Sequence, residues 1–531
     1  MDTFLMGKAN GGGWVAINCI PTAAHTIWGV LAGKLLLGPR SPRSKVVILL
    51  ACGLVFMFSG YGLDWLNITP IIKRIRQIVR DLSWEMLIMN SRCLLSLALS
   101  AWLLSIPVPG GAVEFPEPME KEWLRSDPDI VVYLPRGAEH NDGDNEHFLV
   151  FQAPKSEELL AMWTQSSVED HGDNHVVLAR SSDGEKWSEP QWIHGTHKGT
   201  SEPQASWGFP VVSRQGRIYC FYSSAAQGAE AGVSGVLGAH FSDDNGHTWT
   251  KGAETIVRST LEDPTDLNSE ETEFFIVWQK PIRDRQGRVL AGYTQWTKDW
   301  VGSIYFMRFD NIDEGPDPGD LKITWLPDDG KPIKLPRYVQ PSGCEEPSIV
   351  LLPDGRLFTT MRTTTGYIWY SVSDDDGHHW RDAEVLRDRD NGQPIKQPHA
   401  SCPVYPLRDV RFMLVYHNND YYARNKLYGE ALPENHPNIP IGPIYCYRRP
   451  AHIAVGEFRP QAHQPIWFSE PKQILDTDGM PVGPKRTDEI ATYPSVTDFK
   501  GKEVLWYPDR KHFLLGKYID DEMLSGLDPA P

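Results

Sequence analysis

An acid and an arginine stand at the same end of two adjoining strand-like runs in the stretch 344–380. Glu346 precedes the run SIVLL and Arg362 ends the run RLFTTMR, with the turn Pro353–Gly355 between the two runs. Two antiparallel strands joined by a tight turn bring the start of one beside the end of the other. We therefore expect Glu346 and Arg362 to meet, either within a functional site or as an ion pair across a strand end.

Acidic loops and histidines offer a second kind of chemistry. The loops Asn141–Asn145 and His171–Asn174 could meet and hold a cation such as calcium through oxygen ligands, although they lack an EF-hand pattern; plain acidic turns are the alternative. A histidine on the same face could act as a base. The histidines in question are His140, His147, His171, His399 and His417.

A repeated motif organises the strands that must position these residues. The pattern Ser-x-Asp-x-Gly-x-x-Trp occurs at 373–380 and 242–249, and a form shortened by one residue occurs at 181–187. The tryptophans are 249 − 187 = 62 and 380 − 249 = 131 residues apart, so a degenerate copy is expected between the last two. The region from 113 to 520, at a period of roughly 65, predicts a propeller of about six blades rather than five or seven.

The strand-like runs of the expected blades alternate with turn residues. A segment near Val131 or within Lys511–Ile519 is expected to close the ring by adding a strand to a terminal blade. The predicted blades are His147–Ala153 with Glu158–Gln165 and His175–Ser181; Gly208–Trp249; Phe274–Trp325; Cys344–Trp380; a fifth that begins near Cys402 and carries the insertion Tyr428–Pro443; and a sixth with Thr492–Val496 and Glu503–Pro508.

Charge and cysteine usage narrow the classes of partner. Residues 1–112 carry ten Lys/Arg and four Asp/Glu, or +6, so the remainder carries −23 of the total of −17. An acidic body argues against a nucleic-acid partner, which needs a basic surface. The seven cysteines include no C-x-x-C pair, so they predict buried thiols rather than a zinc site.

The N-terminal region is apolar and is expected to precede the propeller as a hydrophobic helical segment. We expect a membrane segment over 1–85, a signal-peptide-like segment over 86–112 with cleavage near Ala112, and the propeller over 113–531. Gly62–Ile75, within the apolar region 14–80, resembles the C-terminal end of membrane acyltransferases related to heparan-α-glucosaminide N-acetyltransferase. This segment is interpreted as a truncated fusion partner or as a plain anchor.

The three Ser-x-Asp-x-Gly-x-x-Trp turns, at blade spacing, resemble the Asp boxes of the sialidase superfamily. The resemblance covers about 400 residues and implies an all-β, six-bladed propeller of sialidase type. It also implies that Asp183, Asp244 and Asp375 are structural residues on blade turns away from the substrate.

The resemblance further implies a mechanism with a tyrosine nucleophile. Because the substrate carries a carboxylate on its anomeric carbon, a phenol attacks and a neighbouring glutamate takes its proton. Tyr493, in the segment AlaThrTyrProSer, matches the nucleophile and Glu346 matches its base. Asp170 lies near the position of the general acid, with Glu169 and Asp173 as rivals.

Arginines that grip the sugar carboxylate complete the implied site. Arg362 and Arg424 fall where the second and third of these arginines are expected. The first arginine is missing, because the corresponding segment Asn145–Val150 places Glu146 or His147 there; Arg136 is a poor substitute. Such a loss in a desolvated site would weaken carboxylate binding by about 2–4 kcal/mol.

The sequence thus predicts a retaining exo-glycosidase that releases an acidic sugar, sialic acid or a related one, from a glycan substrate. It predicts no cofactor and no metal, and places the propeller outside the cytoplasm, either secreted, periplasmic or membrane-anchored. The alternatives are a hydrolase or lyase for another acidic sugar such as a uronate, and a glycan-binding propeller without turnover.

Overall fold

A computed structural model of the chain describes residues 119–136, 140–169, 172–197, 202–224, 236–252, 271–297, 301–336, 339, 343–419 and 447–529. All of them belong to the C-terminal of two units, Pro116–Pro531. The predicted membrane segment 1–85, the signal-peptide-like segment 86–112 and the insertion Tyr428–Pro443 lie outside the described residues. No helix within the described ranges is long and apolar enough to cross a membrane.

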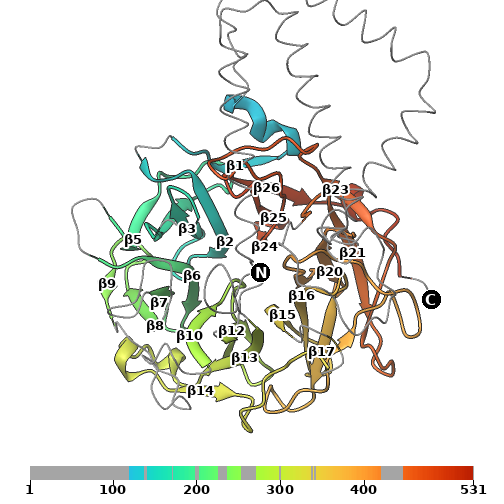
Figure 1. Ribbon diagram of the computed structural model, residues 1–531. Helices are drawn as coiled ribbons and strands as arrows, with labels where there is room; N and C mark the ends of the chain where they lie inside the picture. The colour runs from blue at the N-terminus through green and yellow to red at the C-terminus, as the bar shows by residue number, and fades with distance from the viewer. Residues whose placement is uncertain are drawn as a thin grey trace, which may run out of the picture. The chain divides into compact units, whose positions relative to one another are not determined.

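The described strands form six antiparallel sheets arranged as blades around a ring (Figure 1), so the predicted six-bladed β-propeller is confirmed. Each blade begins with its innermost strand. The sheets are β2 (Asp144–Gln152), β3 (Leu159–Ser166), β4 (His175–Ser181) and β5 (Gln191–Gly195); β6 (Ala205–Val212), β7 (Ile218–Ser224), β8 (Val236–Ser242) and β9 (Thr250–Lys251); β10 (Glu271–Ile276), β11 (Ile282–Arg283), β12 (Val289–Thr297), β13 (Gly302–Phe309) and β14 (Ile323–Leu326); β15 (Cys344–Leu351), β16 (Leu357–Thr363), β17 (Trp369–Ser373) and β18 (Glu384–Val385); β19 (Val404–Pro406), β20 (Phe412–Tyr416), β21 (Ala451–Phe458), β22 (Ile466–Phe468) and β23 (Lys472–Leu475); and β24 (Ser495–Phe499), β25 (Lys502–Asp509) and β26 (Phe513–Ile519) with β1 (Ile130–Tyr133).

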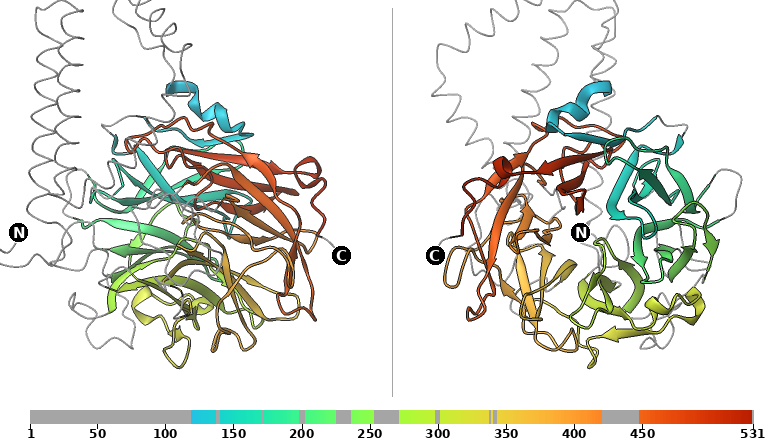
Figure 2. Two further views of the ribbon diagram at one scale, coloured as in Figure 1. Left: turned by 45° about the vertical axis from the view of Figure 1, so that its right-hand side comes forward. Right: turned by 180° about the vertical axis from the view of Figure 1, so that it is seen from behind.

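The ring closes through the first strand of the propeller. Strand β1 pairs antiparallel with β26 and forms the outer edge of blade six, with Ile130 opposite Gly516 and Val131 opposite Leu515. The views in Figure 2 show the earliest described segment beside the last strands of the chain. The expected closure near Val131 and Lys511–Ile519 is therefore present, and it combines both segments. Helices are few and short among the described residues: η2 (Met119–Ser126), η4 (Ile312–Glu314), η5 (Pro318–Asp320) and α6 (Asp521–Leu524).

Six apolar clusters lie between neighbouring blades, one at each junction, including that between blades six and one. Blade six meets blade one through a cluster that contains Phe148, Trp163 and Trp506, all fully buried. The side chains that alternate on each strand therefore face one neighbour or the other. Because every blade shares its core with two others, the sheets stabilise one another rather than folding around separate cores.

The predicted Asp boxes have one common geometry. In the second box Ser242 donates to Asp244 at 2.8 Å and accepts from the Gly246 N–H at 2.8 Å, while Asp244 accepts from the Thr248 N–H at 2.8 Å. Gly246 has φ +82° and faces Leu178 of blade one, so this position favours glycine. The boxes are thus hydrogen-bonded turns that support the contact with the preceding blade.

Topology places the boxes and the predicted site residues at opposite ends of the blades. Each box follows the third strand of its blade, and that strand runs parallel to the innermost strand because two antiparallel pairings separate them. The boxes therefore follow the end at which the innermost strands finish. Glu346 lies near the start of its innermost strand, and Tyr493 lies just before one. The expectation that the boxes lie away from the site is consistent with this arrangement.

Candidate active site

Three of the predicted site residues share one carboxylate oxygen. Tyr493 Oη donates to Glu346 Oε1 at 2.7 Å, and Arg362 Nη1 donates to the same oxygen at 2.6 Å. Arg362 Nη1 also lies 3.2 Å from Tyr493 Oη. Glu346 and Tyr493 are buried, at 2% and 4% exposure. Blade four supplies the acid and the arginine, and blade six supplies the phenol.

An irregular backbone at the start of the innermost strands aims these side chains. Glu346 has φ +51° and Tyr493 has φ +62°, in the left-handed region that favours glycine. The pairing of β15 with β16 shifts register between Glu345 and Ser348. Such bulges turn a side chain out of the regular strand pattern, and backbone strain of this kind costs on the order of 1–3 kcal/mol per residue.

The guanidinium of Arg362 contacts two further side chains, Glu345 and His399. Its Nε lies 3.3 Å from Glu345 Oε2, and its Nη2 lies 3.1 Å from His399 Nδ1. Burial acts to raise the pKa of Glu345, but Arg362 and His399 hold that pKa at about 2, so Glu345 is ionised at neutral pH. Arg362 therefore carries its charge between two carboxylates, in a fixed orientation.

The phenol of Tyr493 is held in its protonated form. Burial, and then the charge of Glu346, raise the pKa of Tyr493 well above its usual value; Arg362, Arg448 and Lys511 act in the opposite direction. A buried phenol with a raised pKa can attack only if a base takes its proton as the new bond forms. Glu346 Oε1, already the acceptor of that proton, is placed to do so.

A second charged group lies beside the first, on the blade-one side. Lys511 Nζ lies 2.8 Å from Glu146 Oε2, 2.7 Å from Glu169 Oε1 and 5.7 Å from the ring centre of Tyr493. Burial raises the pKa of Glu146 to about 7, whereas Lys511 and Lys485 hold the pKa of Glu169 below its usual range in spite of burial. Glu169, a rival for the acid role, is thus kept ionised and is a poor proton donor.

Other predicted residues lie elsewhere. Arg136 is 42% exposed and pairs with Asp142 at 3.5 Å and with Glu189 at 3.1 Å; among the described residues, its partners do not include Glu346, Arg362 or Tyr493. Asp173 accepts from the Ser167 N–H and caps a turn. Asp170 and Arg424 lie outside the described residues.

The first acidic loop has a structural explanation. Asp142 is fully buried and accepts from Tyr133 Oη and from the Arg136 N–H, both at 2.7 Å. Its carboxylate is therefore occupied by protein donors. Across the described ranges, no group of three or more His, Cys, Asp or Glu side chains is arranged to hold a metal ion.

No sequence motif indicated three charged residues of the candidate site: Glu345, Arg448 and Lys511. Arg448 Nη1 lies 2.8 Å from Glu489 Oε2, and its Nε donates to the carbonyl of His399 at 3.2 Å. Lys511 and Arg448 lie in connections between the second and third strands of blades six and five. In this topology these connections open at the same end as the start of the innermost strands, so basic residues within them are a usable signal.

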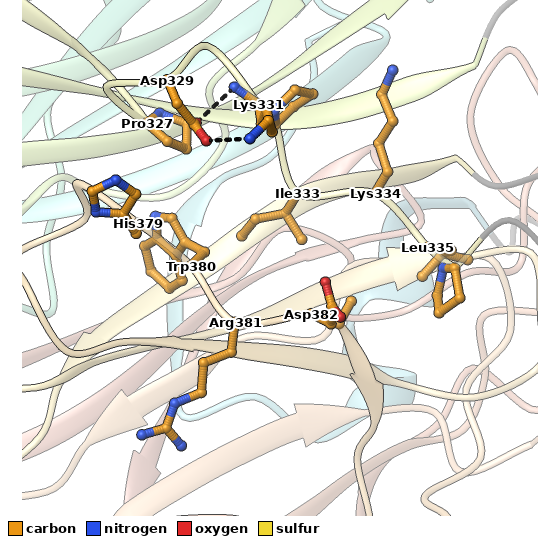
Figure 3. Close-up of a pocket in the computed structure, with 13 residues that line it drawn as sticks. Pro327, Asp329, Lys331, Ile333, Lys334, Leu335, His379, Trp380, Arg381 and Asp382 are labelled. Atoms are coloured by element: carbon orange, nitrogen blue, oxygen red, sulfur yellow. Dashed lines mark hydrogen bonds and ion pairs between the residues drawn. The ribbon is translucent and has the colours of Figure 1, made fainter.

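A separate cavity of about 530 Å³ has the lining shown in Figure 3, which does not include Glu346, Arg362 or Tyr493. It is lined by residues of the third Asp box and of the connection after β14, among them His379, Trp380, Lys331 and Lys334. The Trp380 ring stacks on Phe306 at 4.4 Å, so it is part of the blade junction. The third box follows β17, at the opposite end of blade four from Glu346, so this cavity does not serve the cluster.

Comparison with known proteins gives a domain match over most of the propeller. Residues 157–499 match the BNR repeat-like domain. The comparison with curated proteins found no match to the chain.

Solved structures similar to the chain include proteins with and without a stated activity. A protein of unknown function from Dyadobacter fermentans is 14% identical with a TM-score of 0.49, over 74% of this chain and 98% of that one. The intramolecular trans-sialidase from Ruminococcus gnavus is 13% identical with a TM-score of 0.49, over 77% and 100%. The NanB sialidase from Streptococcus pneumoniae is 12% identical with a TM-score of 0.47, over 74% and 70%.

Proposed function

Because the chain belongs to the BNR repeat-like domain family, we propose that its propeller is a retaining exo-glycosidase that releases sialic acid or a related acidic sugar from glycans. The observation that carries the proposal is the hydrogen bond of 2.7 Å from Tyr493 Oη to Glu346 Oε1. A phenol that already donates to a buried carboxylate is a nucleophile with its base in place. In keeping with this substrate, we propose that the propeller works outside the cytoplasm and needs no cofactor.

The reaction then runs in two steps. In the first, Tyr493 Oη bonds to the anomeric carbon, its proton passes to Glu346, and the glycosidic bond breaks as Asp170 protonates the leaving oxygen. In the second, water attacks the anomeric carbon and gives a proton to Asp170. The bond to Tyr493 breaks, and the phenol recovers its proton from Glu346.

Positive charge around the phenol supports an acidic substrate. Arg362, Arg448 and Lys511 all act to lower the pKa of Tyr493, so all three project positive charge onto the phenol. In this proposal Arg362 holds the sugar carboxylate, since a guanidinium fixed by Glu345 and His399 keeps its orientation before the substrate arrives. Arg424 remains a further proposed contact.

One observation favours a second candidate, a hydrolase or lyase for a uronate. Two of the histidines singled out in the sequence lie at the cluster: His399 beside Arg362 at 3.1 Å, and His147 stacked on Tyr493 with ring centres 4.3 Å apart. A lyase needs a base for the proton beside the sugar carboxylate, which histidine can provide.

The decisive experiment is covalent trapping on the full chain. An aryl α-sialoside and an aryl β-glucuronide are assayed first, and the better substrate fixes the sugar. A fluorinated glycosyl fluoride of that sugar, which slows breakdown of the intermediate, is expected to add its glycosyl mass to the peptide that contains Tyr493. Tyr493→Phe should lose turnover by on the order of a thousandfold and trap nothing.

Tyr370→Phe is the matched control, because Tyr370 is a buried tyrosine of blade four outside the cluster. It should keep both activity and trapping. Turnover without a trapped peptide, with an unsaturated product from polyuronides, would instead support the lyase. Binding of glycans without any turnover would support a propeller that only binds.

A further inference from the structure

His147 occupies the same structural position in blade one as Glu346 in blade four. Its φ is +55°, and the pairing of β2 with β3 shifts register between Glu146 and Leu149, as that of β15 with β16 does around Glu346. Trp207 repeats this geometry in blade two, with φ +55° and a register shift between Ser206 and Phe209. The bulge that presents a proposed catalytic residue in one blade therefore presents an imidazole in another.

Among the described residues, the imidazole of His147 has no hydrogen-bond partner although it is buried. The residue is 1% exposed, and neither Nδ1 nor Nε2 makes a hydrogen bond to any residue that the structure describes. The nearby Glu146 Oε1 lies 3.6 Å from Nδ1, beyond hydrogen-bond distance. Buried polar groups are normally paired, and an unpaired one is costly enough to need an explanation.

The surroundings of His147 are those of a ligand contact. Its ring stacks on the Tyr493 ring at 4.3 Å and meets the Trp207 ring edge-on at 6.0 Å. Burial, and then Lys511, lower the pKa of His147 well below its usual value, so the ring is neutral with one N–H donor and one acceptor nitrogen. Trp207, whose ring meets the imidazole, is partly exposed.

We propose that His147 is a specificity-determining residue that binds a hydroxyl group of the sugar acid held at Tyr493. A hydroxyl can both donate and accept, and so complements a neutral imidazole. The inference rests on the proposed function and adds to it. In this arrangement blade one binds an uncharged hydroxyl of the sugar through His147, and Arg362 of blade four binds the sugar carboxylate.

His147→Phe tests the proposal, because it keeps the stacked ring and removes both nitrogens. We expect kcat/KM on the aryl sugar acid to fall at least tenfold, mainly through KM, and His147→Gln to restore part of the loss, because an amide again donates and accepts. The Phe variant without ligand should melt at a higher temperature than the wild type, by about 2 °C or more, since it no longer buries unpaired nitrogens.

His175→Phe is the matched control in the same blade. The His175 ring nitrogens lie 3.1 Å from the carbonyl of Asp173 and 3.2 Å from Gln165 Oε1, so this variant should lower the melting temperature. If the role of His147 were purely structural, His147→Phe would likewise lower the melting temperature. An unchanged KM, or a lowered melting temperature, in His147→Phe overturns the proposal.

A binding experiment separates this inference from the proposed function. The Tyr493→Phe variant, with and without His147→Phe, is titrated calorimetrically with free N-acetylneuraminate and with glucuronate. If the wild type has no turnover but the Tyr493→Phe variant binds one of these acids at least tenfold more tightly than the double variant does, the hydrolase proposal fails and the His147 proposal stands. Equal affinity of the two titrated proteins, or no binding of either acid, overturns the role of His147.

Discussion

Tyr493 and Arg362 both donate to Oε1 of Glu346, whereas Glu346 Oε2 has no hydrogen-bond partner within the described part of the chain. The carboxylate thus meets the phenol and the guanidinium through a single oxygen. Glu345 binds the same arginine through Oε2, and this oxygen also lies 3.3 Å from His399 Nε2. Two adjacent carboxylates therefore have different tasks: one faces the phenol, and the other fixes the arginine.

Glu346→Gln should lower kcat by about 10²–10⁴, because the amide cannot take the proton of Tyr493. Glu345→Gln is the matched variant and should raise KM more than it lowers kcat, since it loosens Arg362 without touching the phenol. Steady-state kinetics on the aryl glycoside that the wild type cleaves distinguish the two. Equal losses of kcat in both variants would contradict the separate tasks.

Glu146 provides a prediction about pH. Its folded pKa of about 7 lies above the ordinary 4.5, so between these values the folded protein keeps a proton that the unfolded chain releases. The unfolding free energy should therefore fall as pH rises from 4.5 to 7, by on the order of 1–3 kcal/mol from this group. Glu146→Gln should flatten this dependence, measured by urea unfolding at several pH values; an unchanged slope would refute the assignment.

At the residue scale, the resemblance to the sialidase superfamily pointed to Glu346, Arg362 and Tyr493, each of which stands at a strand start or strand end of a repeat. It did not predict Lys511 or Arg448. Both lie in connections whose position relative to the phenol depends on how blades five and six pack. This packing cannot be inferred from the spacing of residues along the chain. His399 appeared only as one of several histidines, for the same reason.

The recurring turn is the informative feature at the scale of the element. Ser242 is 1% exposed and caps the backbone of its box through Gly246. Similar bonds occur in the other two boxes, from Gly184 N–H to Ser181 and from Gly377 N–H to Ser373. These local bonds explain why the repeat can be recognised in the sequence and why its spacing gave the number of blades.

Ser242→Ala should lower the unfolding free energy by about 1–2 kcal/mol, because a buried amide N–H loses its acceptor. Activity per folded molecule should not change, since the box lies at the opposite end of the blade from Tyr493. Urea unfolding and kinetics on the same preparation test both statements. A loss of kcat at unchanged stability would show that the box acts on the site.

Blade three shows the limit of prediction from the repeat. It lacks the box motif, and its place was inferred from the spacing of the motif on either side. The expected Phe274–Trp325 agrees with strands β10 to β14, which begin at Glu271 and end at Leu326. The left-handed positions at the starts of the innermost strands left no sequence signal, because Glu, His, Trp and Tyr occupy them instead of glycine.

At the scale of the whole molecule, stability depends on ring closure. Strand β1 contributes Ile130 and Val132 to the cluster between blades six and one. A lysine adds a contact across the ring: Lys280 Nζ of blade three donates to the carbonyls of Val150 at 2.6 Å and Val496 at 2.8 Å, in blades one and six. The closing strand and this lysine connect blades that are far apart in the sequence.

Val132→Asp should lower the unfolding free energy by about 3–5 kcal/mol, because it places an unpaired carboxylate in this cluster. Hydrogen exchange should rise first in β26, the partner of β1, and later in blades two to four. Val410→Asp is the control, since Val410 is 79% exposed and should tolerate the change. Uniform exchange across all blades in Val132→Asp would show that closure is not the weak point.

Pairing of the first strand with the last also constrains biosynthesis. Ile130 pairs with Gly516, which the ribosome adds 516 − 130 = 386 residues later. Until then the nascent chain carries an unpaired strand edge, together with blades whose apolar faces await a neighbour. Premature termination before β26 has been made would therefore release an open ring, so quality control by chaperones should depend on whether synthesis has passed Ile519.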